Sequence, residues 1–284
     1  MKNLVIGAAH NLTWDKCRVW ANSLRDSGYT GDAVLVYFGD TPLEITENLF
    51  SLNIPIAQFT PLSQTQNVCV TRFIAYHSLL KMAPFKYDWV TATDVTDVVF
   101  QKNPDDFISN LDKHPIGGLN YIHIASSENL SYEQEAWGQN NLIHSFGQYQ
   151  YDTMQNNTIF NAGVISAQQF RMEDICDLIF NMCVGRPQFT YGEGGPDQAA
   201  YNILLSKPSL NYRTFYAEHD SGWACQCGTT MDPNKPQYQA MSDGPLPKFD
   251  GTHVVNSRDE PYHIVHQYNR VPELKEYFER KYNV

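Results

Sequence analysis

The stretch that decides the fold is Trp89-Val-Thr-Ala-Thr-Asp-Val-Thr-Asp-Val-Val-Phe-Gln-Lys-Asn-Pro104. Its apolar, β-branched beginning is typical of a buried strand. The strand ends in two carboxylates, Asp94 and Asp97. Neighbouring buried acids are costly unless a positive charge lies between them, and a divalent cation that holds a phosphate would supply that charge. The alternative is a turn in which either acid caps backbone N–H groups.

Strands and helices alternate on the N-terminal side of this stretch. The pattern predicts strands at residues 2–8, 33–38 and 54–59, and helices at 13–27, 42–51 and 68–82. This alternation indicates a mostly parallel, twisted sheet with helices on both faces. Ligands bind at the carboxyl ends of the strands in such sheets, which is where Asp94 and Asp97 fall. Because side chains alternate along a strand, both acids reach one ion only if the chain bends between them.

The C-terminal half is less regular. Its pattern predicts strands at residues 114–121, 158–167 and 262–266, and helices at 168–184, 196–205 and from 272 onward. Residues 129–151 form a polar, aromatic-rich stretch for which a helix is one interpretation, and residues 217–251 are typical of a loop or flap. We therefore expect an irregular second half attached to a regular sheet.

Charge and length narrow the class of protein. The 284 residues include 20 Lys and Arg against 31 Asp and Glu, a formal net charge of −11. This excess of acid argues against a nucleic acid or an anionic membrane as the main partner, since both attract basic surfaces. The sequence contains no run of 18 apolar residues, so no transmembrane helix is predicted. The first nine residues predict a strand instead of a signal peptide. With six scattered cysteines, we expect reduced thiols and a cytoplasmic protein, and a Golgi-lumenal fragment is less favoured.

Four further clusters accompany the acidic pair. They are Arg72-Phe73, Asn161-Ala-Gly-Val164, Gly194-Gly-Pro-Asp-Gln198 and His263-Ile-Val-His-Gln-Tyr-Asn-Arg270. With these residues the chain resembles nucleotide-sugar glycosyltransferases of the GT-A fold. It is most similar to the subgroup with a D-x-x-D-V-V-F-Q signature and a C-terminal H-Q-Y-x-R, which includes xylosyltransferases of large algal viruses. The order and spacing of the clusters carry the resemblance over about residues 2–270.

The resemblance implies an α/β protein with one Rossmann-like GT-A domain over residues 1–284. Residues 1–104 would form its nucleotide-binding half, and residues 105–284 an acceptor-binding half with a metal-binding segment near the C-terminus. The implied activity is metal-dependent transfer of a sugar, xylose among the choices, from a UDP-sugar to a hydroxyl of an oligosaccharide or glycoprotein glycan. If the protein is viral, its compartment would be the host cytoplasm. We expect inversion at the sugar; a retaining enzyme of this fold, or a metal-dependent sugar-nucleotide hydrolase or nucleotidyltransferase, stays open.

The resemblance also assigns a metal site. Asp94 and Asp97 match the acidic motif that holds Mn²⁺ or Mg²⁺ on the donor diphosphate, although D-x-x-D replaces the commoner D-x-D. His266 matches the histidine that completes the metal sphere, and His263 is the other choice. Imidazole suits Mn²⁺ better than Mg²⁺, so a histidine ligand favours manganese. The alternative for either histidine is a structural role in a C-terminal strand.

Donor-binding residues are expected from several segments. By resemblance, Arg72 and Asp94 contact the donor, and Asn161, Ala162 and Gly163 lie against its sugar. A glycine lets backbone approach a ligand closely, and an Asn amide offers both a donor and an acceptor. Gly7, Ala8 and Ala9 end the first strand and are candidates for the floor of the nucleotide pocket. The alternatives are a strand bulge at Gly163, a surface ion pair at Arg72, and helix packing at Gly7.

Asp197 is the predicted catalytic base. Inverting transfer needs a base to take a proton from the acceptor hydroxyl, and Asp197 follows the glycine-rich residues 192–195 in the first turn of a helix. An acid at that place is also favoured by the helix dipole alone, and in retaining relatives the matching pair, Asp197 and Gln198, positions the donor sugar. Glu193 is the second candidate base. Aromatic residues that could stack on acceptor sugars are Trp137, Tyr149, Tyr191 and Trp223.

Overall fold

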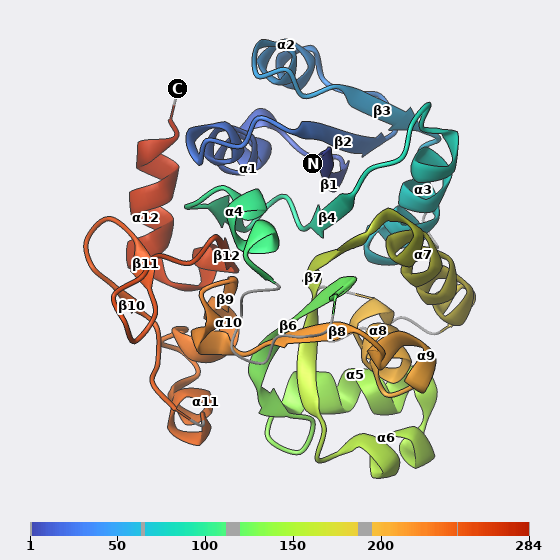
Figure 1. Ribbon diagram of the computed structural model, residues 1–284, viewed down its shortest axis with the longest axis vertical. Helices are drawn as coiled ribbons and strands as arrows, with labels where there is room; N and C mark the ends of the chain where they lie inside the picture. The colour runs from blue at the N-terminus through green and yellow to red at the C-terminus, as the bar shows by residue number, and fades with distance from the viewer. Residues whose placement is uncertain (1, 64–65, 112–119, 187–194, 243, 284) are drawn as a thin grey trace.

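A mixed seven-stranded sheet crosses the centre of the molecule (Figure 1). The computed structural model describes residues 2–63, 66–111, 120–186, 195–242 and 244–283. Within these ranges the strand order is β3 (Ile56–Phe59), β2 (Asp32–Phe38), β1 (Asn3–His10), β4 (Trp89–Thr93), β7 (Thr158–Gln168), β6 (His123–Ser131) and β8 (Thr214–Ala217). Only β7 runs antiparallel to its neighbours, β4 and β6. The predicted mostly parallel α/β sheet is confirmed.

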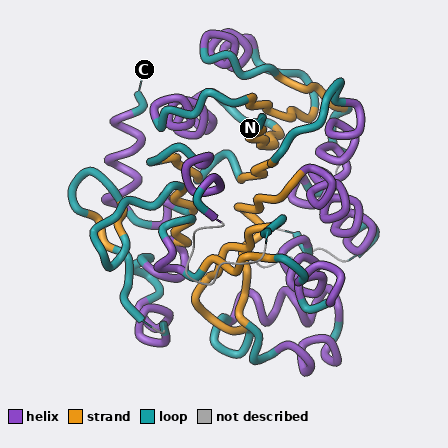
Figure 2. The backbone as a smooth tube through the Cα atoms, in the orientation of Figure 1, coloured by secondary structure: helices purple, strands orange, loops and turns teal. Residues whose placement is uncertain are grey.

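Helices cover both faces of this sheet, as Figure 2 shows by the purple coils around the orange strands. Alternate residues of β1 explain why. Val5 belongs to the core that includes Trp20 of α1 (Trp14–Asp26) and residues of α2 (Leu43–Ser51). Leu4 belongs to the opposite core, which includes Phe73 of α3 (Val68–Met82) and residues of α7 (Gln169–Cys183) and α8 (Asp197–Leu205). The period of two along the strand thus sorts apolar side chains to the two layers.

A second, three-stranded sheet joins distant parts of the chain. Its order is β5 (Val98–Phe100), β12 (Ile264–His266) and β9 (Ala224–Gln226). Strand β12 pairs antiparallel with β5 and parallel with β9. The C-terminal helix α12 (Pro272–Lys281) covers this sheet, because its Leu274 and Phe278 share a core with Val265. The segment near the C-terminus is therefore held beside the end of β4.

Short elements complete the described chain. They are α4 (Pro104–Ser109), α5 (Ala136–Phe146), α6 (Gln148–Met154), α9 (Pro208–Asn211), η2 (His219–Ser221), α10 (Cys227–Thr230), α11 (Pro236–Met241), β10 (Lys248–Phe249), β11 (Val254–Val255) and η3 (Tyr268–Arg270). Among the described residues, the helices lack the combination of length and apolar character that a bilayer crossing requires.

Two predictions for the second half need correction. A strand was expected at residues 114–121, of which 114–119 lie outside the described residues; the strand of this region is β6, starting at His123. Strand β6 carries polar side chains but pairs with a strand on each side. Buried partners satisfy these side chains: His123 Nε2, for example, lies 2.7 Å from the Tyr201 hydroxyl. The expected loop over residues 217–251 likewise contains β9, α10 and α11, which are too short for a sequence period to show. The helical interpretation of residues 129–151 is confirmed in α5 and α6.

An ion-pair cluster ties α3 to α7 through Glu173. Lys81 and Lys86 lie 2.5 and 3.0 Å from its carboxylate oxygens, and Gln169 donates to it at 2.7 Å. Burial alone would raise the pKa of Glu173, but these three donors outweigh it and lower the pKa to about 2. Because its folded-state pKa is lowered, Glu173 contributes stability above its ordinary pKa of 4.5, and that contribution is lost as the pH falls through about 2.

We expect Glu173→Gln to lower the urea midpoint at pH 7 and to make progressively less difference between pH 4.5 and pH 2. Urea titrations of both proteins at several pH values measure this. Asp174→Asn, at the exposed neighbouring position, is the matched control and should leave the midpoint almost unchanged. A difference between Glu173→Gln and wild type that stays constant down to pH 2 would show that charge is not its cause.

Candidate functional site

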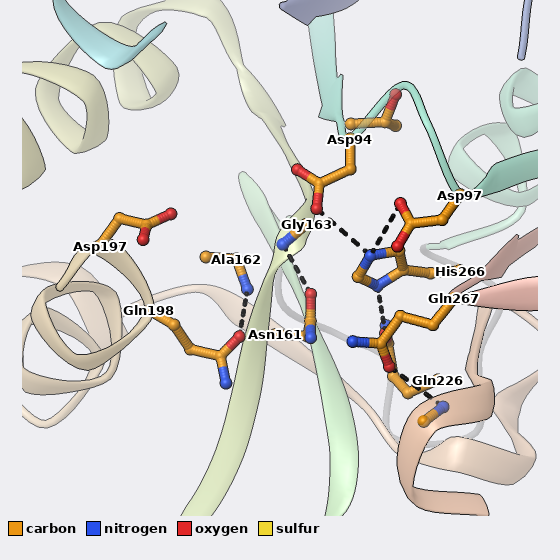
Figure 3. Close-up of polar contacts among 12 residues, drawn as sticks. Asp94, Asp97, Asn161, Ala162, Gly163, Asp197, Gln198, Gln226, His266 and Gln267 are labelled. Carbon is orange, nitrogen blue, oxygen red and sulfur yellow. Dashed lines mark hydrogen bonds and ion pairs between the residues drawn. The ribbon is translucent and has the colours of Figure 1, made fainter. Parts of the chain in front are cut away.

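Two carboxylates and an imidazole meet at the end of β4 (Figure 3). His266 Nε2 lies 3.3 Å from Asp94 Oδ2 and 3.6 Å from Asp97 Oδ1. One possible ligand atom from each residue lies within 4.8 Å of the others. The chain turns between β4 and β5, so the bend that the spacing of the two acids required is present.

Strand register explains why the histidine is there. Strand β5 begins at Val98, directly after Asp97, and the antiparallel pairing places His266 opposite Val98. On its other side His266 is paired with Gln226, whose Oε1 lies 2.7 Å from His266 Nδ1. In this arrangement Nδ1 can donate to the amide oxygen, and Nε2 is the ring nitrogen that faces the two acids. A second hydrogen bond of this kind is how proteins orient metal-binding histidines.

Gly163 leaves the space that the imidazole fills. A Cβ atom at residue 163 would lie 2.4 Å from His266 Cε1. The backbone of Gly163 is also bonded on both sides, since its N–H donates to Asn161 Oδ1 at 2.6 Å and its carbonyl accepts from Asp94 N–H at 2.8 Å. The glycine of the Asn-Ala-Gly segment thus sets the distance between β7 and the acid–imidazole cluster.

The protonation states of the cluster are mutually dependent. Burial would lower the pKa of His266, but Asp97 and Asp94 raise it. Burial raises the pKa of Asp97, and the nearby Asp94 raises it further. Within the described part of the chain, Asp97 Oδ1 is buried without a hydrogen-bond partner. A buried, unpartnered carboxylate oxygen beside a correctly oriented imidazole fits a divalent cation, and the mixed oxygen–nitrogen set suits Mn²⁺.

The other histidine of the C-terminal motif lies elsewhere. His263 Nδ1 is 2.8 Å from the carbonyl oxygen of Asn103, and its ring packs edge-on against Phe107. Burial lowers the pKa of His263 to about 4. It is therefore a neutral, structural histidine, and the structure brings His266 to the acids instead.

Arg72 joins the cluster to α8. Its guanidinium contacts the Asp94 carboxylate, lies 3.0 Å from Asp197 Oδ2, and donates to the Ala162 carbonyl at 3.2 Å. Arg72 is only 7% exposed, so this is a buried ion pair and not the surface pair considered as the alternative. Arg72 and His266 outweigh the effect of burial and lower the pKa of Asp94. Removal of this guanidinium would leave Asp197 buried without its cation, and Asp94 with His266 alone.

These groups line one cavity of about 520 Å³, a typical size for a small-molecule site. The predicted site residues on its wall are Arg72, Asp94, Asp97, Asn161, Ala162, Gly163, Asp197, Gln198 and His266. Among the described residues that line it, none belongs to the segment Gly7–Ala9. A Cβ atom at Gly7 would lie 2.5 Å from Val95 and 3.2 Å from Trp20, so close packing explains this glycine. The nucleotide-binding role of Gly7, Ala8 and Ala9 stays a prediction.

The predicted base, Asp197, lies at the start of α8 on the far side of the Asn161–Gly163 segment from His266 (Figure 3). Burial raises the pKa of Asp197, and the ion pair with Arg72 opposes that rise. The next residue, Gln198, accepts from the Ala162 N–H at 3.3 Å through Oε1. Asp197 as a base stays a prediction, and Glu193, the second candidate base, lies outside the described residues.

Of the four aromatic residues that were predicted to stack on acceptor sugars, the described cavity lining includes one. Trp137 of α5 lines the cavity. Trp223 is fully buried in the core, so its predicted stacking on an acceptor is wrong. Tyr149 is 82% exposed on α6 and does not belong to the described cavity lining, and Tyr191 lies outside the described residues.

Sequence reasoning missed four contributors to the site. Gln226 contacts His266 of the acid–imidazole cluster, and Glu128, Glu135 and Lys235 line the cavity. None belongs to a recognisable motif. The signal for Glu128 was an acid in a strand of small residues, Ala-Ser-Ser-Glu, where a charged side chain needs a reason to be buried.

We expect Gly163→Ala to destabilise the fold by about 1–3 kcal/mol, the usual range for overpacking, because the new methyl group displaces the His266 ring. In a His266→Ala background the same change should cost much less, since the ring is gone. Urea unfolding of the two single variants and the double variant measures the coupling. Simple additivity would show that the methyl group disturbs something other than the imidazole.

Asp97→Asn should weaken Mn²⁺ binding at least tenfold, since it removes a ligand charge from the cluster. The measurement is thermal unfolding across a titration of Mn²⁺, because an ion that binds only the folded form raises its midpoint. Asp40→Asn, at an exposed position, is the matched control and should respond to Mn²⁺ like wild type. Equal responses from Asp97→Asn and wild type would exclude this cluster as the metal site.

Comparison with known proteins identifies the fold. No protein-family model matches this sequence, and no curated protein matches it either. The apo form of the glycosyltransferase GlyE of Streptococcus pneumoniae TIGR4 is similar in structure, with a TM-score of 0.53 and 15% identity over 94% of this chain and 54% of GlyE. This chain therefore spans about half the length of GlyE.

A second similar structure matches over most of its own length. The galactosyltransferase LgtC, in complex with donor and acceptor sugar analogs, gives a TM-score of 0.52 and 16% identity over 93% of this chain and 86% of LgtC. An active-site mutant of LgtC gives a TM-score of 0.51. At such identities the similarity establishes the fold, and this chain has the α/β fold of these GT-A glycosyltransferases.

Proposed function

We propose that this chain is a metal-dependent glycosyltransferase that moves a sugar from a nucleotide-diphosphate donor to a hydroxyl group of a glycan. The observation that carries the proposal is the cluster of Asp94, Asp97 and His266 at the carboxyl end of β4, next to the Asn161–Gly163 segment. Sites in sheets of this kind lie at that edge. The same cluster and segment carry the sequence resemblance to nucleotide-sugar glycosyltransferases.

The charge of the cavity supports a metal on the donor. Among the described residues, its wall carries five carboxyl groups against three Lys or Arg side chains, counting Asp94, Asp97, Glu128, Glu135 and Asp197 against Arg72, Lys235 and Arg270. An acidic cavity repels a diphosphate unless a cation compensates. Asp94, Asp97 and His266 would hold that cation. When bound, it would act as a Lewis acid that stabilises charge on the departing diphosphate.

The chain's own groups would hold the donor sugar. Asn161 and Gln198 present amide groups at the wall, and Gly163 brings the backbone close to the ligand. Arg72 adds a buried guanidinium that is already oriented by Asp94 and Asp197. Preorganised charges and dipoles of this kind need no rearrangement when the reaction occurs. UDP as the nucleotide and xylose as the sugar are proposals supported by the sequence resemblance.

The expected stereochemical outcome is inversion, with a carboxylate taking the acceptor proton. The sequence analysis predicts Asp197 as that base. The ion pair of Asp197 with Arg72 also suits a role in holding the donor. In a retaining enzyme, the alternative interpretation, Asp197 and Gln198 would have that role. An oligosaccharide or glycoprotein glycan would approach over Trp137, because an indole face suits a sugar ring.

We expect release of nucleoside diphosphate from a UDP-sugar to need both Mn²⁺ and an acceptor glycan. A panel of UDP-sugars, UDP-xylose included, assayed against fucose-containing and other glycans, measures this. Asp97→Asn should abolish the release, since it removes a metal ligand, and Asp40→Asn should retain it. Metal-dependent release that proceeds at the same rate without acceptors would identify a sugar-nucleotide hydrolase instead.

A further inference from the structure

A third carboxyl group, away from the acidic motif, faces the same cavity. Glu128 lies in β6 where the pairing with β7 slips, between the pairs Ser127–Phe160 and Ser131–Thr158. Asn129, the next residue, has a positive φ of 63°. Irregularities of this kind re-aim a side chain beside active sites. The backbone is fixed there by Thr229 of α10, whose hydroxyl donates to the Glu128 carbonyl at 2.8 Å.

The two carboxylate oxygens of Glu128 have different surroundings. Oε1 accepts from Asn161 Nδ2 at 2.6 Å and from Gln198 Nε2 at 2.9 Å. In the part of the chain that the structure describes, both side-chain hydrogen bonds of Glu128 are made by Oε1, and Glu128 lines the cavity. One oxygen is therefore held by the proposed donor-sugar residues, and the other is left to meet a ligand. Two fixed bonds on Oε1 define the direction of Oε2.

Among the described residues, Glu128 differs from Asp94 and Asp197 because no cation pairs with it, and from Glu135 because it caps no helix. Arg72 holds both Asp94 and Asp197. Glu135 caps α5 by accepting from the backbone N–H groups of Trp137 and Gly138. Glu128 is bonded only to neutral amides. A carboxylate without a cation partner remains the most available proton acceptor.

The electrostatic surroundings of Glu128 agree with this. Burial and the nearby Glu135 together raise the pKa of Glu128 to about 7, against the opposing effects of the two amides and His266. A base is most effective when its pKa lies near the working pH. The titratable and charged groups that surround it are Glu135 of α5, Tyr132, Tyr238 of α11, His266 of β12, and the cavity residues Asp197 and Lys235.

We propose that Glu128, and not Asp197, is the general base that deprotonates the acceptor hydroxyl; this proposal rests on the proposed function. In the step, Glu128 Oε2 takes the hydroxyl proton while the acceptor oxygen forms a bond to the anomeric carbon. The bond from that carbon to the phosphate oxygen breaks, and its electron pair leaves with the nucleoside diphosphate. Asp197 keeps Arg72 in place on the donor side. The anomeric configuration inverts.

The test compares Glu128→Gln with wild type. The amide oxygen can still accept from Asn161 and Gln198, so donor affinity measured by calorimetry with Mn²⁺ should stay within about threefold. Transfer should fall about 100- to 10 000-fold. Wild-type kcat/KM should decrease as the pH falls below about 7, because the base becomes protonated, and this acidic limb should vanish from the residual activity of the variant. Glu133→Gln, at an exposed position in the next loop, is the matched control and should behave as wild type.

Several results would overturn the assignment. One is Glu128→Gln with more than a tenth of wild-type transfer, and another is loss of donor affinity in that variant. A third is an acidic limb that disappears in Asp197→Asn and persists in Glu128→Gln. A product with retained configuration, read by NMR, would also exclude a base acting in inversion. If wild type itself releases no nucleoside diphosphate from any UDP-sugar, the proposed function fails and the base assignment falls with it.

Discussion

The antiparallel pairing of β5 with β12 is the interaction on which the site depends. It joins the residues that follow the acidic motif to a segment more than 160 positions later in the chain, and it fixes His266 opposite Val98. A slip of one residue in this register would turn the imidazole to the other face. The apolar cluster beneath β12, with Val265 and Phe278, opposes such a slip. Packing far from the cavity therefore determines whether the acids gain an imidazole partner.

Burial of so many carboxyl groups in one cavity requires a separate means of compensation for each. Asp94 and Asp197 share a guanidinium, Glu135 satisfies backbone N–H groups, and Glu128 is bonded by amides. Asp97 is left with an unpartnered oxygen. The different partners help to explain why the pKa of Asp94 is lowered while those of Asp97, Glu128 and Asp197 are raised. Asp97 beside His266 and Glu128 beside two amides are therefore in different electrostatic surroundings within one cavity.

The sequence allowed much of this arrangement to be predicted, for identifiable reasons. The continuous apolar strands and amphipathic helices of residues 2–100 carry their period locally, so their order predicted the sheet. Asp94, Asp97 and His266 belong to motifs with defined spacing. Strand β6 was misplaced because its side chains are polar and are satisfied only by partners such as Tyr201 and Thr214 from distant segments. The role of Gln226 arises from strand register and leaves no local pattern. The role of Glu128 arises from a strand irregularity, and its only local signal is an acid among small residues.

The shared guanidinium of Arg72 has a consequence for how the two ends of the cavity communicate. Asp94 belongs to the acid–imidazole cluster, and Asp197 opens helix α8. Any positive ion that neutralises Asp94 leaves Arg72 with a single anionic neighbour, so its hold on Asp197 strengthens. A change of charge at Asp94 can therefore affect the start of helix α8 through the Arg72 side chain.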